Sequence, residues 1–297
     1  MGGCAMSSDV LNFYLPDFYT NVNLFCFFHD MQQSAPSCFY DDVKITSAYG
    51  SFPNCIWNGG RVILDRVSKD MIEAVLKQYR DRGIKVRFTF TNPLIEEKHL
   101  ADHFCNMVME LADHVGNEVL VNAPVLEQYI REKYPDYALI SSTTKCLNDF
   151  ERIKDELEKD YSLVVLDSAL NNTPEIFAMD HRDRVELIVN HYCADNCPRR
   201  KMHYNVIGKA QMEYSNTPPD WQCNNVNREF FRVMENRSFI STELMFGKYR
   251  EAGFRHFKLD GRGFPAHRLI AAMLYYFVKP QWHDQFWQII LREIYKI

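Results

Sequence analysis

Short apolar runs recur along the chain, each bounded by polar residues. They are rich in Val, Ile and Leu, and their near-continuous apolarity is typical of strands buried on both faces of a parallel sheet. We expect strands at 43–49, 84–90, 117–122, 137–142, 162–167, 185–190 and 255–259, and a weaker one at 238–241.

Helical patterns lie between these runs. In 66–82, Val67, Met71, Val75 and Leu76 share one helical face, and Gly83 follows where a helix-ending glycine belongs. Further helices are expected at 96–115, 124–134, 147–159, 173–182, 243–252, 265–279 and 282–296. About eight strand–helix repeats indicate an α/β fold, either a closed (β/α)8 barrel or an open doubly wound sheet. The strand count and the chain length favour a single TIM-like barrel with C-terminal helices.

The predicted organisation is one barrel domain over 1–297, because no linker, repeat or low-complexity tract divides the chain. Residues 1–40 are expected to form an irregular N-terminal segment, and 265–297 the C-terminal helices. Residues 191–225 form the least regular stretch, a cysteine-rich loop with several prolines. A loop of this length in a compact domain is usually functional.

Composition narrows the class of protein. Of 297 residues, 46% are hydrophobic and 25% charged, with a net charge of −5, so there is no basic footprint for nucleic acid. No apolar run reaches the ~18 residues that a membrane span needs, and 22–28 is too short. The nine cysteines are an odd number, and most sit singly in apolar segments, which indicates a reducing, cytoplasmic environment.

The strongest candidate chemistry lies at 190–204, NHYCADNCPRRKMHY. Cys193 and Cys197 follow the end of a predicted strand, at the face where barrels carry their active sites, and Cys223 closes the same loop. Thiolates in this arrangement suit zinc or an iron–sulfur cluster. A four-iron cluster needs a fourth ligand, for which Cys55 and Cys146 both follow strands and Cys55 is preferred.

A second candidate region is the stretch 253–262, GFRHFKLDGR. As the final barrel strand it would place Lys258, Asp260 and Arg262 at the catalytic rim, with Gly261 allowing a tight turn. Arginine there would suit a carboxylate or phosphate. An ordinary Asp-Gly-Arg turn with a structural ion pair is the alternative.

The stretch 248–262 resembles the closing signature of the collagenase-like peptidase family, peptidase U family 32, whose relatives include anaerobic ubiquinone-biosynthesis and tRNA and rRNA hydroxylation proteins. The turn 58–61, Asn-Gly-Gly-Arg, and the cysteine-rich region after the sixth expected strand also resemble that family. The resemblance implies a barrel that carries a 4Fe-4S cluster bound by four cysteines, and oxygen-independent hydroxylation, although the family name records a peptidase activity.

The first hypothesis is therefore an iron–sulfur barrel enzyme with the cluster on Cys193, Cys197, Cys223 and Cys55. His191 and Arg199 would contact the cluster, while Asp260, Arg262, Lys258 and Arg61 would orient an anionic substrate or oxygen donor.

Two alternatives stay open. One is a peptidase or other hydrolase, in which a cysteine nucleophile would need a basic partner such as His191 or His203. The other is a non-catalytic, cluster-bearing subunit of a homo- or heterodimer. The substrate, small or macromolecular, is not indicated by the residues.

Overall fold

The computed structural model describes residues 9–113, 116–194, 197–218 and 229–296. Eight parallel strands form a closed barrel in chain order, with β8 pairing back onto β1. The predicted (β/α)8 architecture with C-terminal helices is thus confirmed. The strands are β1 (Leu11–Pro16), β2 (Val43–Gly50), β3 (Lys85–Phe90), β4 (Glu118–Val121), β5 (Ala138–Ser141), β6 (Leu163–Val165), β7 (Val185–Ile188) and β8 (His256–Lys258).

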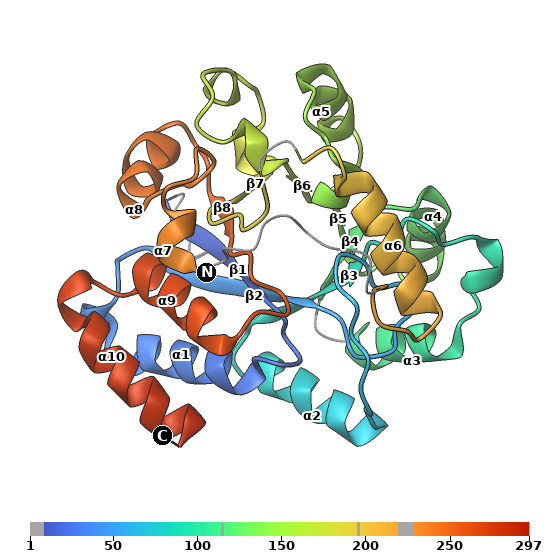
Figure 1. Ribbon diagram of the computed structural model, residues 1–297, viewed down its shortest axis with the longest axis horizontal. Helices are drawn as coiled ribbons and strands as arrows, with labels where there is room; N and C mark the ends of the chain where they lie inside the picture. The colour runs from blue at the N-terminus through green and yellow to red at the C-terminus, as the bar shows by residue number, and fades with distance from the viewer. Residues whose placement is uncertain (1–8, 114–115, 195–196, 219–228, 297) are drawn as a thin grey trace, which may run out of the picture.

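A ring of helices surrounds the strands (Figure 1). The helices are α1 (Val22–Ser34), α2 (Lys69–Arg80), α3 (His103–Ala112), α4 (Pro124–Lys133), α5 (Phe150–Leu157), α6 (Arg200–Met212), α7 (Phe230–Val233), α8 (Thr242–Leu244), α9 (Ala266–Phe277) and α10 (His283–Ile290). Side-chain caps begin several of them: Ser68, Asp102 and Asp149 accept hydrogen bonds from backbone N–H groups of α2, α3 and α5. Pro124 begins α4, where its missing N–H costs nothing.

Two apolar cores follow from the alternation of side chains along each strand. The larger core lies between the strands and the surrounding helices. The smaller core lies inside the barrel and includes Tyr14, Tyr49, Leu120 and Ile188. Charged side chains also enter the barrel interior, where Arg87 is fully buried between strands β3, β4 and β7.

The N-terminal segment differs from expectation. Residues 1–40 were predicted to be irregular, yet they contain β1 and α1. β1 has a register shift between Phe13 and Tyr14 and ends in a proline, but its sequence, LNFYLP, is mostly apolar like the runs that were expected to be strands. Its pairing with both β2 and β8 closes the barrel, and this tertiary context fixes it as a strand.

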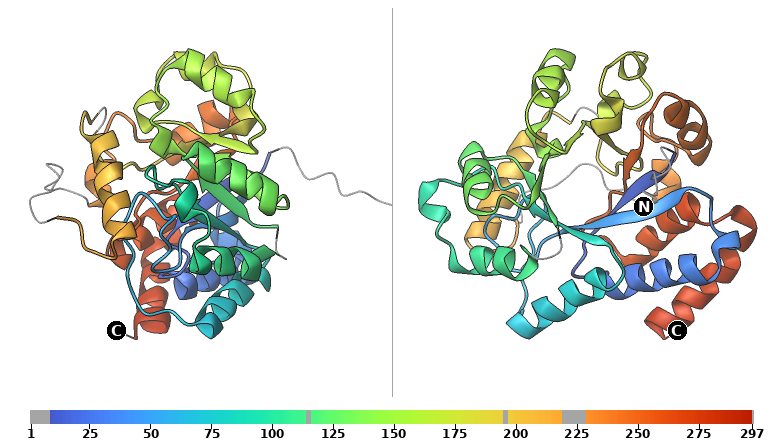
Figure 2. Two further views of the ribbon diagram at one scale, coloured as in Figure 1. Left: turned by 90° about the vertical axis from the view of Figure 1, so that its right-hand side faces the viewer. Right: turned by 180° about the vertical axis from the view of Figure 1, so that it is seen from behind.

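The prediction of an irregular loop over 191–225 is also partly wrong, because this segment contains the helix α6. This helix has weak amphipathic periodicity: Gly208 and Gln211 are among its buried residues. α6 lies at one end of the molecule rather than in the ring, as the side view in Figure 2 shows. It packs on the loops that follow β2 and β3, where Asn92 donates to the Gly208 carbonyl and Gln211 to that of Ile63.

Two further expected elements are absent from the described part of the chain. Short turns at Ser168–Leu170, Glu175–Phe177 and Arg182–Arg184 replace the helix expected at 173–182. The weaker strand at 238–241 is wrong as well: that segment is bonded to the β7 end through Ile240 N to Val189 O and through the Asn171 side chain. The Asn171 side chain thus links this segment to β7 in place of a regular ladder of backbone hydrogen bonds.

Candidate active site

A pocket of about 110 Å³ opens at the carboxyl ends of the strands. The segments after β2, β3, β5, β7 and β8 line it, together with the first turns of α6. The four residues predicted to orient a substrate, Arg61, Lys258, Asp260 and Arg262, all lie in this lining, as do His191 and Cys193. The structure therefore brings together side chains that are up to about 200 positions apart in the sequence, as barrel topology predicts.

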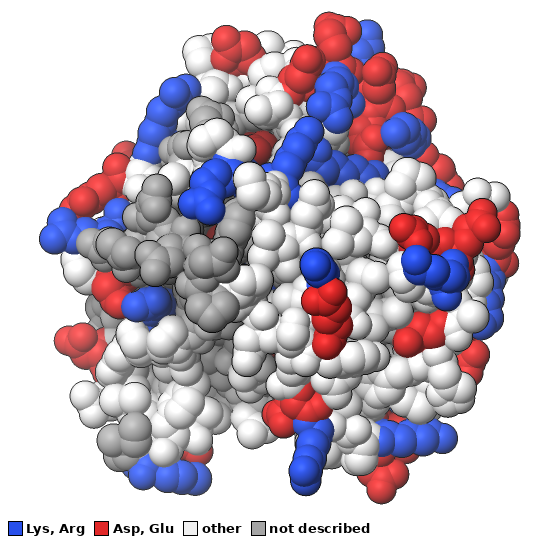
Figure 3. Space-filling model, turned by 45° about the vertical axis from the view of Figure 1, so that its right-hand side comes forward, with Lys and Arg blue, Asp and Glu red and all other residues white. Residues whose placement is uncertain are grey.

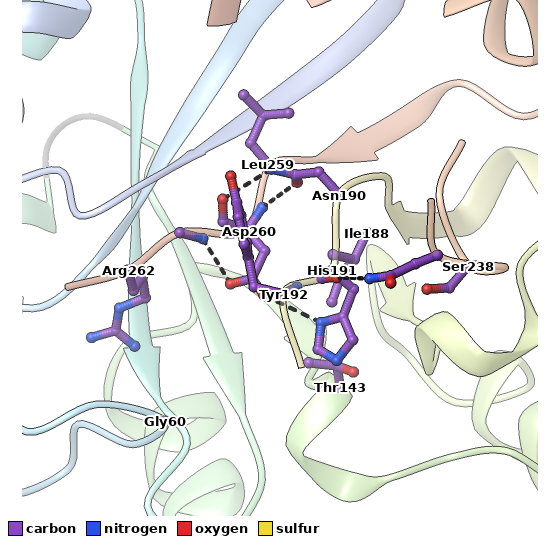
Figure 4. A network of polar contacts seen from close by, with 12 residues as sticks. Gly60, Thr143, Ile188, Asn190, His191, Tyr192, Ser238, Leu259, Asp260 and Arg262 are labelled. Carbon is purple, nitrogen blue, oxygen red and sulfur yellow. Dashed lines mark hydrogen bonds and ion pairs between the residues drawn. The ribbon is translucent and has the colours of Figure 1, made fainter. Parts of the chain in front are cut away.

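Cys193, His191 and Asp260 line the same pocket, and His191 is hydrogen-bonded to Asp260. His191 Nδ1 lies 3.2 Å from Asp260 Oδ2, a contact drawn in Figure 4. Cys193 lines the same pocket, and the His191 side chain acts on its thiol to lower the thiol pKa. This is the arrangement of a nucleophile, a base and an orienting carboxylate.

The charges of the three groups depend on one another. The hydrogen bond to His191 lowers the pKa of the Cys193 thiol below its usual value, and the nearby Arg200 acts in the same direction. Burial alone would lower the pKa of His191, but the bonds to Asp260 and Cys193 outweigh it and raise that pKa to about 9. Burial likewise opposes ionisation of Asp260, yet the bond to His191 holds the pKa of this carboxyl well below its ordinary range. The shifts of Cys193 and His191 both act toward a thiolate beside an imidazolium, while the positive charge of Arg200 next to His191 opposes the imidazolium.

Hydrogen bonds beyond the strand ends hold Asp260 and His191 in place. The Asn190 side chain accepts from Asp260 N at 2.7 Å and donates to Asp260 O at 3.2 Å (Figure 4). The Gly261 N–H donates to Asp260 Oδ1 at 2.8 Å. Asn236 donates to the His191 carbonyl. Both carboxylate oxygens of Asp260 thus accept hydrogen bonds, which is consistent with an ionised side chain.

Arg200 links α6 to this chain of residues. Its Nη1 is paired with Asp167 Oδ2, while Nη2 lies 3.3 Å from His191 Nε2 and donates to the Ala194 carbonyl. Sequence reasoning did not single out Tyr204, which also lines the pocket. Arg200, His203 and Tyr204 stand at i, i+3 and i+4 of one helix, a spacing that would have indicated a shared face had α6 been recognised.

Arg262 has a different role from the one expected of it. Its guanidinium is buried and binds Asp17 Oδ1 at 3.1 Å, the Gly59 carbonyl at 2.8 Å and Asn58 Oδ1 at 3.0 Å. These contacts join the end of β1, the turn after β2 and the end of β8. Arg262 is therefore committed to holding three loops at the rim, even though it borders the pocket.

The cysteines expected to share a cluster do not all meet. Cys55 is fully buried in the core, where it interacts with the buried Cys105 of α3. It does not belong to the pocket lining. Cys193 and Cys197 lie in the segment after β7, whereas Cys223 lies outside the described residues. The set of four with Cys55 as the fourth ligand thus does not fit the structure.

Within the described ranges, no three His, Cys, Asp or Glu side chains are grouped so that they could hold a metal ion. Arg199, the other residue expected to contact a cluster, directly precedes α6 and has interaction partners of its own. The ring nitrogens of His191 already contact Asp260 and Arg200.

The surface adds two observations. None of the described helices is long and apolar enough to cross a membrane. On the face shown in Figure 3, basic and acidic side chains are intermixed around a broad uncharged area. That face therefore presents no continuous basic stripe of the kind that binds a nucleic-acid backbone.

Comparison with known proteins supports the architecture. No family model and no curated protein matches the sequence. A solved structure of the U32 peptidase Mk0906 is similar to this chain, with a TM-score of 0.56 and 17% sequence identity, and the match covers 89% of this chain and 98% of that one. The chain therefore has the barrel fold of a U32 peptidase.

Proposed function

We propose that this protein is a thiol-dependent hydrolase that cleaves peptide or other amide bonds at the barrel rim. The observation that carries the proposal is the position of His191, which is hydrogen-bonded to Asp260 and lowers the pKa of the Cys193 thiol in the same pocket. The fold shared with a structure described as a peptidase supports amides as the substrate class.

The reaction uses each group in turn. The sulfur of Cys193 attacks the carbonyl carbon, and the thiol proton resides on His191. When the tetrahedral intermediate collapses, the C–N bond breaks and the leaving amine takes that proton, which leaves a thioester on Cys193. A water molecule activated by His191 then hydrolyses the thioester and restores the thiol. Asp260 stays ionised and holds the imidazole in its working orientation.

Replacing Cys193 by alanine tests the proposal. On a panel of peptide and small amide substrates, Cys193→Ala is expected to lower kcat by at least about a thousandfold, the scale seen when a triad nucleophile is removed. Asp260→Asn should lower kcat as well, because a neutral carboxamide does not stabilise the imidazolium. The control is Cys38→Ala, since this partly exposed thiol lies outside the pocket. Hydrolysis that persists in Cys193→Ala would contradict the proposal.

A cluster on the cysteines of the 191–225 region is a second candidate. It is favoured by the lowered thiol pKa of Cys193 beside Arg200, because a thiolate is the form that binds iron. Cys193, Cys197 and Cys223 would be its ligands, and a bound cluster would supply electron-transfer chemistry such as the hydroxylation implied by the family resemblance.

Iron analysis separates the two candidates. After anaerobic reconstitution with iron and sulfide, a cluster would give a brown protein with stoichiometric iron, which Cys193→Ala would lose. A colourless, iron-free protein that hydrolyses amides would support the hydrolase and reject the cluster. A stoichiometric cluster in a protein without hydrolase activity would reverse that conclusion.

A further inference from the structure

The pocket contains a second reactive side chain, which the proposed hydrolysis does not use. Lys258 is the last residue of β8, and its side chain is 6% exposed, with the amine inside the pocket lining. Nζ lies 3.9 Å from the centre of the Tyr49 ring. A lysine amine is rarely buried without a specific reason.

Lys258 is paired by charge rather than by a directed hydrogen bond. Nζ lies 3.4 Å from Glu186 Oε1, yet that oxygen has no hydrogen-bond partner in the described structure. The other carboxylate oxygen of Glu186 is taken by Arg87. The amine therefore keeps the freedom to point its lone pair or its N–H groups at a molecule in the pocket.

The surroundings also favour the neutral, nucleophilic form of this amine. Burial lowers the pKa of Lys258 to about 8, since the nearby positive charges of Arg87 and Arg262 add to the desolvation and outweigh Glu186. At pH 7.5 about a quarter of such a group is neutral, against about one in a thousand for an ordinary lysine. Buried lysines of this kind are the ones that form Schiff bases in enzymes.

Arg61 supplies a binding group for a negative charge in the same pocket as the amine. Its Nε donates to the Arg262 carbonyl at 3.1 Å and its Nη1 to the Gly60 carbonyl at 2.7 Å, so backbone contacts hold the guanidinium at the pocket wall. Among the described residues, no carboxylate lies within ion-pair distance of it. Arg262 and Arg200, by contrast, each have an aspartate partner.

We infer that Lys258 captures the carbonyl carbon of small oxo acids as an imine, with Arg61 binding their carboxylate. The cavity, about 110 Å³, suits a compound of a few carbon atoms. This inference does not depend on the hydrolase, because the reactive nitrogen and Cys193 are different groups in the same pocket.

The capture step balances without any further reactant. The neutral amine attacks the carbonyl carbon, a C–N bond forms, and the electron pair of the C=O bond moves to oxygen. Glu186, 3.4 Å from Nζ, carries two protons in turn from the nitrogen to the oxygen: the first converts the alkoxide to a hydroxyl, and the second lets that hydroxyl leave as water while the C=N bond forms. The product is an imine on Lys258, and one water molecule is released.

Reductive trapping tests the inference. The folded protein is incubated with glyoxylate and sodium cyanoborohydride, the reductant that makes the imine permanent, and the modified residue is located by peptide mass mapping. We expect one adduct, on Lys258, and at least a tenfold loss of labelling in Lys258→Arg. The control is Lys77→Arg, because Lys77 is exposed on α2. Labelling spread evenly over surface lysines of the wild-type protein would overturn the inference, whatever the variants do.

Two further readouts sharpen the test. Arg61→Met should lower the preference for glyoxylate over the neutral acetaldehyde at least tenfold, while capture of acetaldehyde persists. An unchanged preference would show that Arg61 does not bind the carboxylate. Trapping should also survive in Cys193→Ala, so that failure of the hydrolase and failure of capture can be told apart.

The pH dependence of trapping is a separate expected result. Lys258 is surrounded by Glu186, Arg87, Arg262 and Tyr49, and in this setting its pKa is about 8. The initial rate of capture should therefore rise with pH and reach half its maximum near pH 8. A midpoint above pH 10, as for a solvated lysine, would contradict the assignment.

Discussion

Replacing Arg87 by methionine is expected to destabilise the barrel by about 3–5 kcal/mol, the cost of leaving buried charges without their partner. Arg87 is 0% exposed and binds Glu118 at 2.8 Å and Glu186 through a short contact. Its guanidinium also lies 3.8 Å from the centre of the Tyr14 ring. Without Arg87, Glu118 keeps only the partly exposed Lys85 and Glu186 keeps only Lys258 as cations among the described residues, each at 3.4 Å.

Urea unfolding and thermal denaturation measure this effect, and we expect Tm to fall by roughly 10 °C. The control is Lys69→Met, which removes an exposed pair with Glu73 on α2 and should cost less than about 1 kcal/mol. Combining Arg87→Met with Glu118→Gln and Glu186→Gln should restore part of the loss. Equal stability of Arg87→Met and wild type would show that the buried pairs are not coupled.

The stability lost in Arg87→Met should also depend on pH, and the direction of this dependence follows from the pKa of Glu118. Burial would raise the pKa of Glu118, but Arg87 outweighs it and lowers that pKa below the unfolded value. This ion pair therefore adds stability above the ordinary glutamate pKa, and the contribution disappears as the pH falls through the lower folded value. The difference between Arg87→Met and wild type should shrink below about pH 4.

Replacing Gly208 by alanine is expected to displace α6 and to cost about 2–3 kcal/mol, in the range for overpacked sites. A Cβ at this position would lie 2.3 Å from Asn92 Oδ1 and 3.0 Å from its Cγ. Asn92 cannot move aside easily, because its amide donates to the carbonyls of Ile56 and Gly208 and its Oδ1 accepts from Leu94 N. A displaced α6 would carry Arg200 away from His191.

The matched control is Gly247→Ala, a glycine in the helical segment Met245–Tyr249 with nothing within 4 Å of the added carbon. That change should be neutral or stabilising by up to about 1 kcal/mol, because alanine is the better helix former. The free energy of unfolding of both variants decides the question, and any hydrolase activity should fall only in Gly208→Ala. If both variants behave alike, the close approach of α6 to Asn92 does not matter.

The barrel could be predicted because each strand after β1 stands out in the sequence as a short apolar run. The seven runs from 43–49 to 255–259 each correspond to an observed strand. β1 was overlooked although its sequence, LNFYLP, is also mostly apolar, and its pairing with both neighbours closes the barrel. α6 was missed for a different reason: its buried residues include Arg200, Gly208 and Gln211, which weaken the apolar periodicity.

The candidate site was predictable as a place but not as a mechanism. Barrel topology puts the ends of β7 and β8 at one rim, so proximity of His191, Cys193 and Asp260 followed from the order of the strands. Which cysteine lies beside which base depends on the conformation of the loops, and no sequence pattern records that conformation. Cys55 illustrates the limit: a strand-end position was consistent with the rim, yet its side chain packs inward against Cys105.

The paired contacts between Asn190 and Asp260 have a consequence for the shape of the rim. A carboxamide has the same donor and acceptor as a peptide group. The Asn190 side chain therefore makes two hydrogen bonds to the Asp260 backbone that take the place of main-chain bonds between the segments after β7 and β8. The two backbones can diverge beyond these hydrogen bonds and leave space for a bound molecule, while the spacing of the residues that follow stays fixed. At position 190, aspartate would lack the donor, leucine would lack both the donor and the acceptor, and glutamine would be one carbon too long.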